Sequence, residues 1–139
     1  MPDIKRKVIK PDKLTQPSVY PYSQAVRVRA GELLFIAGQP AIDANAGTVG
    51  VGDMAAQTRQ VYANIGAALE SAGVDFSHVV ELTTFIVGRE NLDAHRVTLL
   101  WLYKEYFPDG DYPPDTVVLV DGLYREEFLL EVKAIAVLP

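Results

Sequence analysis

Apolar residues recur along the chain at two different spacings, and each spacing predicts one kind of secondary structure. Between residues 53 and 73 they repeat every three or four positions, which predicts a helix with one apolar side. Asp53 is the expected N-cap, and Gly73 is the expected residue just past the helix end. The apolar side of this helix is expected to consist of Met54, Val61, Ile65, Ala68, Leu69 and Ala72.

A second helix is expected over residues 92–107, with Asn91 as its N-cap and Pro108 as its stop. Its residues facing the rest of the domain are expected to be Val97, Leu100, Trp101 and Phe107.

Strand patterns occupy most of the remaining chain. In residues 25–29 the valines alternate with arginines; the chain is expected to turn at residues 30–32 and to continue as LLFIAG, forming a β-hairpin. Further strands are expected over residues 78–88, 116–120 and 127–137, which are rich in β-branched and apolar residues. A short extra strand is expected near Thr48 and Val49.

The order β-β-α-β-α-β-β predicts an α+β domain, a two-layer sandwich with both helices on one face of a mixed sheet. The other face of the sheet also carries apolar residues, so copies of the chain are expected to associate through their sheets. Residues 1–17 are polar and interrupted by prolines, which indicates an N-terminal arm, and residues 18–139 form the single domain.

Charge and composition narrow the class of protein. The net charge of −5 argues against a nucleic-acid partner, and the basic cluster near the N-terminus is expected to be solvated. No apolar run is long enough to cross a membrane and no signal-peptide core is visible, so a cytoplasmic location is expected. The chain has no cysteine and no nucleotide-binding motif. Its two histidines, His78 and His95, fall in different elements and are expected to be ordinary surface or boundary residues. No metal site and no cofactor are therefore expected.

Two carboxylates stand out near the C-terminal end. Glu131 interrupts an otherwise aliphatic strand, either as a cleft carboxylate or as an exposed residue beside Lys133. Asp115 follows two prolines, where it is either a turn residue or a second carboxylate in the same cleft. If the two share a cleft, mutual repulsion raises one pKa, an arrangement suited to proton transfer.

Several motifs together resemble the YjgF/RidA family, also called the Rid family. They are PYSQAVRV (21–28), LLFIAGQPAID (33–43), DMAAQTRQVYANIGAALESAG (53–73), VVELTTFIV (79–87), YKEYFP (103–108) and LLEVKAIAV (129–137). The resemblance covers nearly everything after residue 17. It implies a fold similar to chorismate mutase of the trimeric type, a homotrimer with clefts between subunits, and hydrolysis of enamines and imines to keto acids and ammonia.

The resemblance also implies roles for individual residues. Tyr22 matches a tyrosine that lines the cleft, Gly38 a glycine whose backbone faces the ligand, and Glu131 a glutamate that positions or activates water. From its pattern alone, Tyr22 is otherwise a half-buried strand aromatic. Two positions depart from the family: Ala37 replaces a serine, and Asp115 replaces the arginine that binds the substrate carboxylate. Arg89 and Arg96 are expected on a solvated face of the second helix; the alternative is that one of them supplies the missing cation.

These departures lead to the functional expectation. The chain is expected to be a Rid-family hydrolase or deaminase that acts on a small enamine, imine or related nitrogen compound, and not on the ordinary 2-imino acids. The alternative is a non-catalytic trimer that binds a small molecule or a partner. The older family label of ribonuclease or translation inhibitor is disfavoured by the acidic charge.

Overall fold

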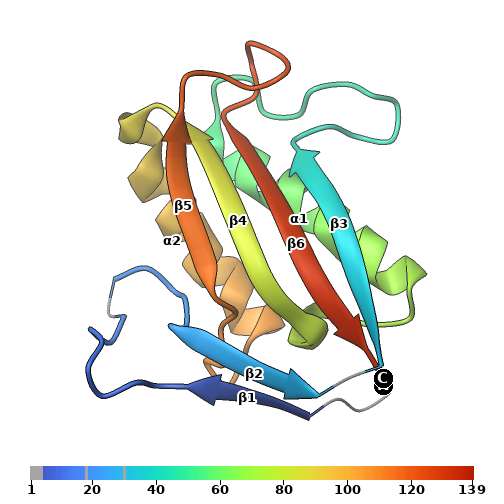
Figure 1. The fold of residues 1–139 in the computed structure, drawn as a ribbon. Helices are drawn as coiled ribbons and strands as arrows, with labels where there is room; N and C mark the ends of the chain where they lie inside the picture. The colour runs from blue at the N-terminus through green and yellow to red at the C-terminus, as the bar shows by residue number, and fades with distance from the viewer. Residues whose placement is uncertain (1–4, 18, 30) are drawn as a thin grey trace.

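The structure, a computed structural model, describes residues 5–17, 19–29 and 31–139. Two α-helices cover one face of a four-stranded sheet, and a separate two-stranded ribbon lies beside it (Figure 1). The expected α+β class, with both helices on the same face of a mixed sheet, is confirmed. Within the described residues, no helix has the length and apolar character needed to span a membrane.

The four-stranded sheet has its last strand in the interior. Its strands are β3 (Glu32–Pro40), β6 (Leu130–Leu138), β4 (Val79–Val87) and β5 (Asp115–Val120), side by side in that order. β6 is antiparallel to both β3 and β4, whereas β5 is parallel to β4 and leaves one edge of the sheet open. The short strand expected near Thr48 is a single bridge between Ile42 and Thr48.

The first helix, α1 (Met54–Ser71), follows its sequence signals. The Asp53 side chain accepts a hydrogen bond from the Ala56 backbone N–H, as expected of an N-cap. Gly73 has a φ of 76°, a conformation that a residue with a Cβ rarely adopts, and it ends the helix as expected. The predicted apolar side is confirmed, because Met54, Val61, Ile65 and Leu69 are buried and Ala68 and Ala72 pack against the core.

The second helix, α2 (Leu92–Tyr106), presents a different face to the core from the predicted one. Val97 and Trp101 are 42% and 65% exposed, so their predicted packing on the sheet is wrong, although Phe107 is buried as expected. The buried residues of the helix are His95, Thr98, Leu99 and Tyr103. Hydrogen bonds inside the protein satisfy His95 and Thr98, so these polar residues occupy the inner face.

The start of α2 also differs in detail. Asn91 lies just before the helix, at the end of the short 3-10 turn η2 (Arg89–Asn91), but its side chain makes no capping hydrogen bond. It donates to the Val87 carbonyl instead, so Asn91 holds the predicted N-cap position of α2 but makes no capping hydrogen bond.

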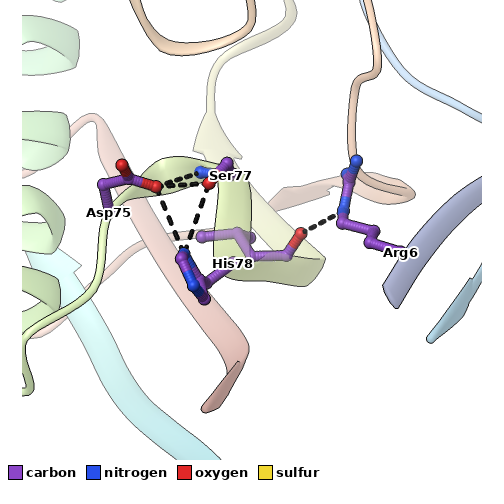
Figure 2. Close-up of polar contacts among 5 residues, drawn as sticks. Arg6, Asp75, Ser77 and His78 are labelled. Atoms are coloured by element: carbon purple, nitrogen blue, oxygen red, sulfur yellow. Dashed lines mark hydrogen bonds and ion pairs between the residues drawn. The ribbon is translucent and has the colours of Figure 1, made fainter. Parts of the chain in front are cut away.

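The N-terminal ribbon consists of β1 (Lys5–Ile9) and β2 (Ala25–Arg29), paired antiparallel. The predicted hairpin of residues 25–38 is therefore wrong, because β2 pairs with β1 whereas β3 pairs with β6. Part of the expected arm is a paired strand. Arg6 ties it to the domain by donating from Nε to the carbonyl of Val79, at the start of β4 (Figure 2).

A hydrogen-bonded turn lies beside that anchor. In η1 (Phe76–His78), the Asp75 carboxylate accepts hydrogen bonds from the backbone N–H and the hydroxyl of Ser77 and lies 3.2 Å from Nδ1 of His78 (Figure 2). His78 is only 2% exposed, so its expected position at the surface or boundary is wrong. The turn caps the start of β4, next to the residue that receives Arg6.

Candidate functional site

The two acids singled out from the sequence point to opposite faces of the sheet. Glu131 pairs across the strands with Phe85 of β4, and Asp115 pairs with Leu82 of the same strand. Because side chains alternate along a strand, positions 82 and 85 face opposite ways, and so do the two acids. Asp115 faces the helices and Glu131 faces the outer side. Within one chain the two carboxylates therefore do not share a cleft.

Glu131 lies directly against Gly38 on the neighbouring strand. A Cβ placed on Gly38 comes 2.6 Å from Oε2 and 2.8 Å from Cδ of Glu131. Gly38 falls at the irregularity of β3 between Ile36 and Gln39, where the register with β6 shifts. The glycine therefore leaves the space that the carboxylate occupies, and Ala37, Gly38 and Glu131 together are called the Glu131 half-site.

Asp115 is held by two hydroxyl groups at the first position of β5. Its Oδ2 accepts a hydrogen bond of 2.9 Å from Tyr20, and its Oδ1 accepts one of 2.9 Å from Thr84. Burial raises the pKa of Asp115, while the two hydrogen bonds act in the opposite direction. Burial is thus the cause of the raised pKa of Asp115. Repulsion from Glu131, which was expected if the two acids shared a cleft, is not among the causes.

The hydrogen bonds continue from Asp115 into the core. The Tyr20 hydroxyl lies 3.1 Å from Nε2 of His95, and Nδ1 of His95 lies 3.0 Å from the hydroxyl of Thr58. Burial lowers the pKa of His95 to about 4, so the imidazole is neutral at pH 7. Since Tyr20 donates to Asp115, its oxygen accepts from Nε2–H of His95, and Nδ1 accepts from Thr58.

Sequence reasoning missed this network. His95 is fully buried, so its expected position at the surface or boundary is wrong. Tyr20 lies two residues before Tyr22, the tyrosine that the motif pointed to. No spacing in the sequence joins Tyr20, Thr58, Thr84 and His95, because they come from four separate segments that only the fold brings together.

A pocket of about 750 Å³ runs along the open edge of β5. Its lining includes Tyr22 and Asp115, two of the site residues expected from the sequence, together with Arg89 of η2 and Arg96 of α2. Arg96 already forms an ion pair, because its Nη2 lies 2.7 Å from Oδ1 of Asp93. This Asp115 pocket therefore combines a carboxylate, a phenol and two guanidinium groups.

The pocket reaches around the strand edge. Val118 also lines it, and Val118 points to the outer face because it pairs with Phe85, which shares that face with Glu131. The outer face itself carries exposed apolar side chains, with Leu33 61% and Phe35 70% exposed. Within the part of the chain that the structure describes, no group of three or more His, Cys, Asp or Glu side chains is placed to hold a metal ion.

Comparison with known proteins shows which protein family the chain belongs to. The sequence model of the endoribonuclease L-PSP family matches residues 14–138. The chain therefore belongs to this family, which includes the Rid proteins.

Individual relatives agree with this assignment. A mouse protein named 2-iminobutanoate/2-iminopropanoate deaminase is 34% identical over 137 residues, covering 99% of this chain and 95% of the relative. Protein DfrA of Myxococcus xanthus is 39% identical over 132 residues, covering 95% of each chain. In three dimensions the fold is similar to that of YyfB, a Yersinia pestis protein of unknown function from the Rid family, with a TM-score of 0.85 and 34% identity. That match covers 96% of this chain and 98% of YyfB.

Proposed function

We propose that the protein is a Rid-type hydrolase that releases ammonia from a small enamine, imine or related nitrogen compound, in clefts between the subunits of a homotrimer. The observation that carries the proposal is the Glu131 carboxylate lying against Gly38, a strand glycine with no side chain to exclude a ligand. Family membership and the deaminase name of the mouse relative support the same reaction class.

The cleft is proposed to be assembled from two chains. One chain cannot place the Glu131 half-site and Asp115 on the same small ligand, because they face opposite sides of its sheet. Packing the apolar outer faces of several copies together buries Leu33 and Phe35. In a trimer similar to that of chorismate mutase, the open β5 edge of one subunit then meets the Glu131 half-site of the next.

The proposed reaction needs one acid–base group. Glu131 takes a proton from water as the water oxygen bonds to the imine carbon, and the carbon–nitrogen double bond becomes single. The protonated Glu131 returns that proton to nitrogen, which gives a carbinolamine. Glu131 then takes the proton of the new hydroxyl group and delivers it to nitrogen as the carbon–nitrogen bond breaks and the carbonyl forms, so that a carbonyl compound and ammonia leave. Tyr22 and the Gly38 backbone orient the substrate during both steps.

Asp115 sets the substrate preference in this proposal. A substrate carboxylate next to ionised Asp115 is repelled by about 4 kcal/mol at roughly 4 Å, or about a thousand-fold in affinity. A neutral or cationic nitrogen group is therefore preferred at Asp115. An anionic group is accommodated only on the other side of the pocket, near Arg89 and Arg96.

A non-catalytic binding trimer is the second candidate. It is favoured by one observation, that both carboxylate oxygens of Asp115 already accept hydrogen bonds, from Tyr20 and Thr84. The resemblance implies that Asp115 also replaces the arginine that binds the substrate carboxylate. Such a protein keeps the pocket and binds ligands without turnover.

Ammonia release from a panel of freshly generated substrates tests the proposal. We expect neutral imines or enamines to react faster than 2-aminoacrylate, and Glu131→Gln to lower the rate roughly a hundred-fold or more. Gly38→Ala should also lower the rate, because the new methyl group displaces the carboxylate, whereas Gly122→Ala, with nothing within 4 Å of the new Cβ, should not. Thermal unfolding confirms that each variant is folded.

Two other results would contradict parts of this proposal. Fast turnover of 2-aminoacrylate by the wild type contradicts the assigned role of Asp115, and Asp115→Asn should relax the preference if the role is right. Ligand binding without turnover, unaffected by Glu131→Gln, supports the binding trimer instead.

A further inference from the structure

The β1–β2 ribbon concentrates positive charge on an otherwise acidic molecule. Residues 1–31 contain seven lysine and arginine residues but only two aspartates, a net charge of +5. Residues 32–139 contain six lysine and arginine residues and 16 acidic residues, a net charge of −10. The charge of the protein is thus separated along the chain, and the structure gathers much of the positive part on two paired strands.

The pairing register places like charges directly opposite each other. Lys5 pairs with Arg29 and Lys7 pairs with Arg27, and all four side chains are exposed. Because these positions are two residues apart on each strand, all four side chains lie on the same face of the ribbon. Like charges directly opposite in a sheet destabilise it, so the ribbon carries an electrostatic cost in the free protein.

This face of the ribbon forms part of a concave surface of about 660 Å³. The residues that line it are Lys5, Arg6, Lys7, Arg27, Val28 and Arg29. Among these described residues there is no carboxylate to neutralise the cations and no aromatic ring on which a base could stack. The surface therefore offers charge and hydrogen-bond donors and little else.

The ribbon is also anchored, so its cations hold a defined position relative to the domain. Arg6 lies on the opposite face from Lys5 and Lys7, and its Nε donates to the Val79 carbonyl (Figure 2). Its Nη2 is buried and has no hydrogen-bond partner within the described residues. Burial lowers the pKa of Arg6, whereas the nearby charge of Asp111 acts in the opposite direction. Arg6 is thus a fifth, partly desolvated cation, on the other face of the ribbon from the four exposed ones.

We propose that the β1–β2 ribbon is a binding site for a short polyphosphate anion, either inorganic tripolyphosphate or the phosphate chain of a nucleoside triphosphate. Guanidinium groups bind phosphate oxygens in pairs and ammonium groups act as point charges, and both are present on each strand. The bound anion removes the repulsion between the cross-strand cations.

The charge distribution favours a short anion over a nucleic acid. A long polyanion extends past the ribbon over the remainder of the chain, whose net charge of −10 repels it. Its affinity also depends on many phosphate contacts, and single strands usually need aromatic stacking, which this surface does not offer. A compact, highly charged anion places all its charge on the four exposed cations.

Titration calorimetry on the full chain at low salt tests the site with tripolyphosphate, ATP and orthophosphate. We expect tripolyphosphate and ATP to bind with similar dissociation constants, orthophosphate to bind much more weakly, and the affinity to fall as salt is added. The double variant Lys7→Gln/Arg27→Gln should weaken tripolyphosphate binding roughly ten-fold or more. The control Arg59→Gln/Lys104→Gln removes the same charge from exposed helix positions and should leave binding unchanged.

Thermal unfolding provides a readout that does not depend on enzymatic activity. Tripolyphosphate should raise the Tm of the wild type and of the control, but not that of the ribbon variant. Equal binding by the ribbon and control variants overturns the proposal. ATP binding much more tightly than tripolyphosphate, or tight binding of a single-stranded RNA that tripolyphosphate does not displace, overturns it too.

Discussion

His95 shows how a residue that is usually polar and exposed can become part of the core. It connects the two helices to the site, because its ring contacts Thr58 of α1 on one side and Tyr20, and through it Asp115, on the other. The imidazole stays neutral because charging it in this position costs solvation energy that nothing nearby returns.

Acid should therefore weaken the fold through His95. Its pKa is near 6.5 in the unfolded chain and about 4 in the folded protein, so its stabilisation is fully present above pH 6.5 and is lost as the pH falls toward 4. A difference of that size corresponds to about 3 kcal/mol. Urea unfolding at pH 7 and pH 4.5 should show a smaller loss for His95→Gln than for the wild type.

Asp115 contributes a pH dependence of stability opposite to that of His95, so removing it provides a control for the experiment. Because its folded pKa is raised, its stabilisation is present below the unfolded pKa and is lost as the pH rises through the folded value. Repeating the comparison in an Asp115→Asn background removes this opposing contribution. Identical pH slopes with and without His95 in that background contradict the argument.

At the scale of elements, a buried glutamine connects α1 to the segment that leads into β6. Gln57 donates from Nε2 to the carbonyls of Gly50 and Glu127, and its Oε1 accepts from the Leu129 N–H. The side chain is fully buried, so no water is available to replace these bonds. Gln57 thus fixes the backbone two residues before Glu131.

Replacing this glutamine with an apolar residue of similar size should destabilise the protein. Gln57→Leu leaves three backbone groups without their partner, and we expect the free energy of unfolding in urea to fall by about 2–3 kcal/mol. Gln60→Leu, one helical turn along and only half-buried, is the matched control and should cost less than about 1 kcal/mol. Similar losses for the two variants are the result that would refute the assigned role of Gln57.

The elements also show where sequence patterns succeed and where they fail. The stripe, cap and terminal glycine of α1 are local features, so they predicted the helix correctly. The β2–β3 hairpin was wrongly predicted because a local turn signal cannot reveal that β6, about a hundred residues later, pairs with β3. The face of α2 was wrongly predicted because the hydrogen bonds that bury His95 come from other segments.

The candidate site also shows that local features are readable from the sequence and long-range pairing is not. Of the residues that the motifs singled out, Tyr22 and Asp115 line one pocket and Gly38 lies beside Glu131, whereas their roles stay predictions. They did not reveal that the two groups face opposite sides of the sheet, because that depends on the register between β4, β5 and β6. The separation of Asp115 from the Glu131 half-site thus depends on strand pairing. A one-residue shift in the register of β5 or β6 would bring both acids to the same face of the sheet.

At the scale of the whole molecule, the exposed outer face of the sheet is the main feature that a single chain leaves unexplained. The proposed trimer covers this face, and the proposed cleft requires it. Phe35→Glu should therefore convert the assembly to smaller species in sedimentation velocity and should remove ammonia release together with it.

An exposed aromatic residue on the helical side gives the control. Trp101→Glu changes the charge of a 65% exposed side chain and should leave the mass and the activity unchanged. A wild-type protein that sediments as a monomer and is nevertheless active refutes the composite cleft.

The position of β6 between β3 and β4 also affects how the chain is made in the cell. Because β6 follows both neighbours in the sequence, a growing polypeptide on the ribosome presents β3 and β4 before the strand that joins them exists. The backbone edges that β6 will pair stay unpaired through the synthesis of about ninety further residues for β3 and about forty for β4, when a nascent chain is most open to wrong partners. Chaperone demand during translation is therefore expected to end when β6 emerges.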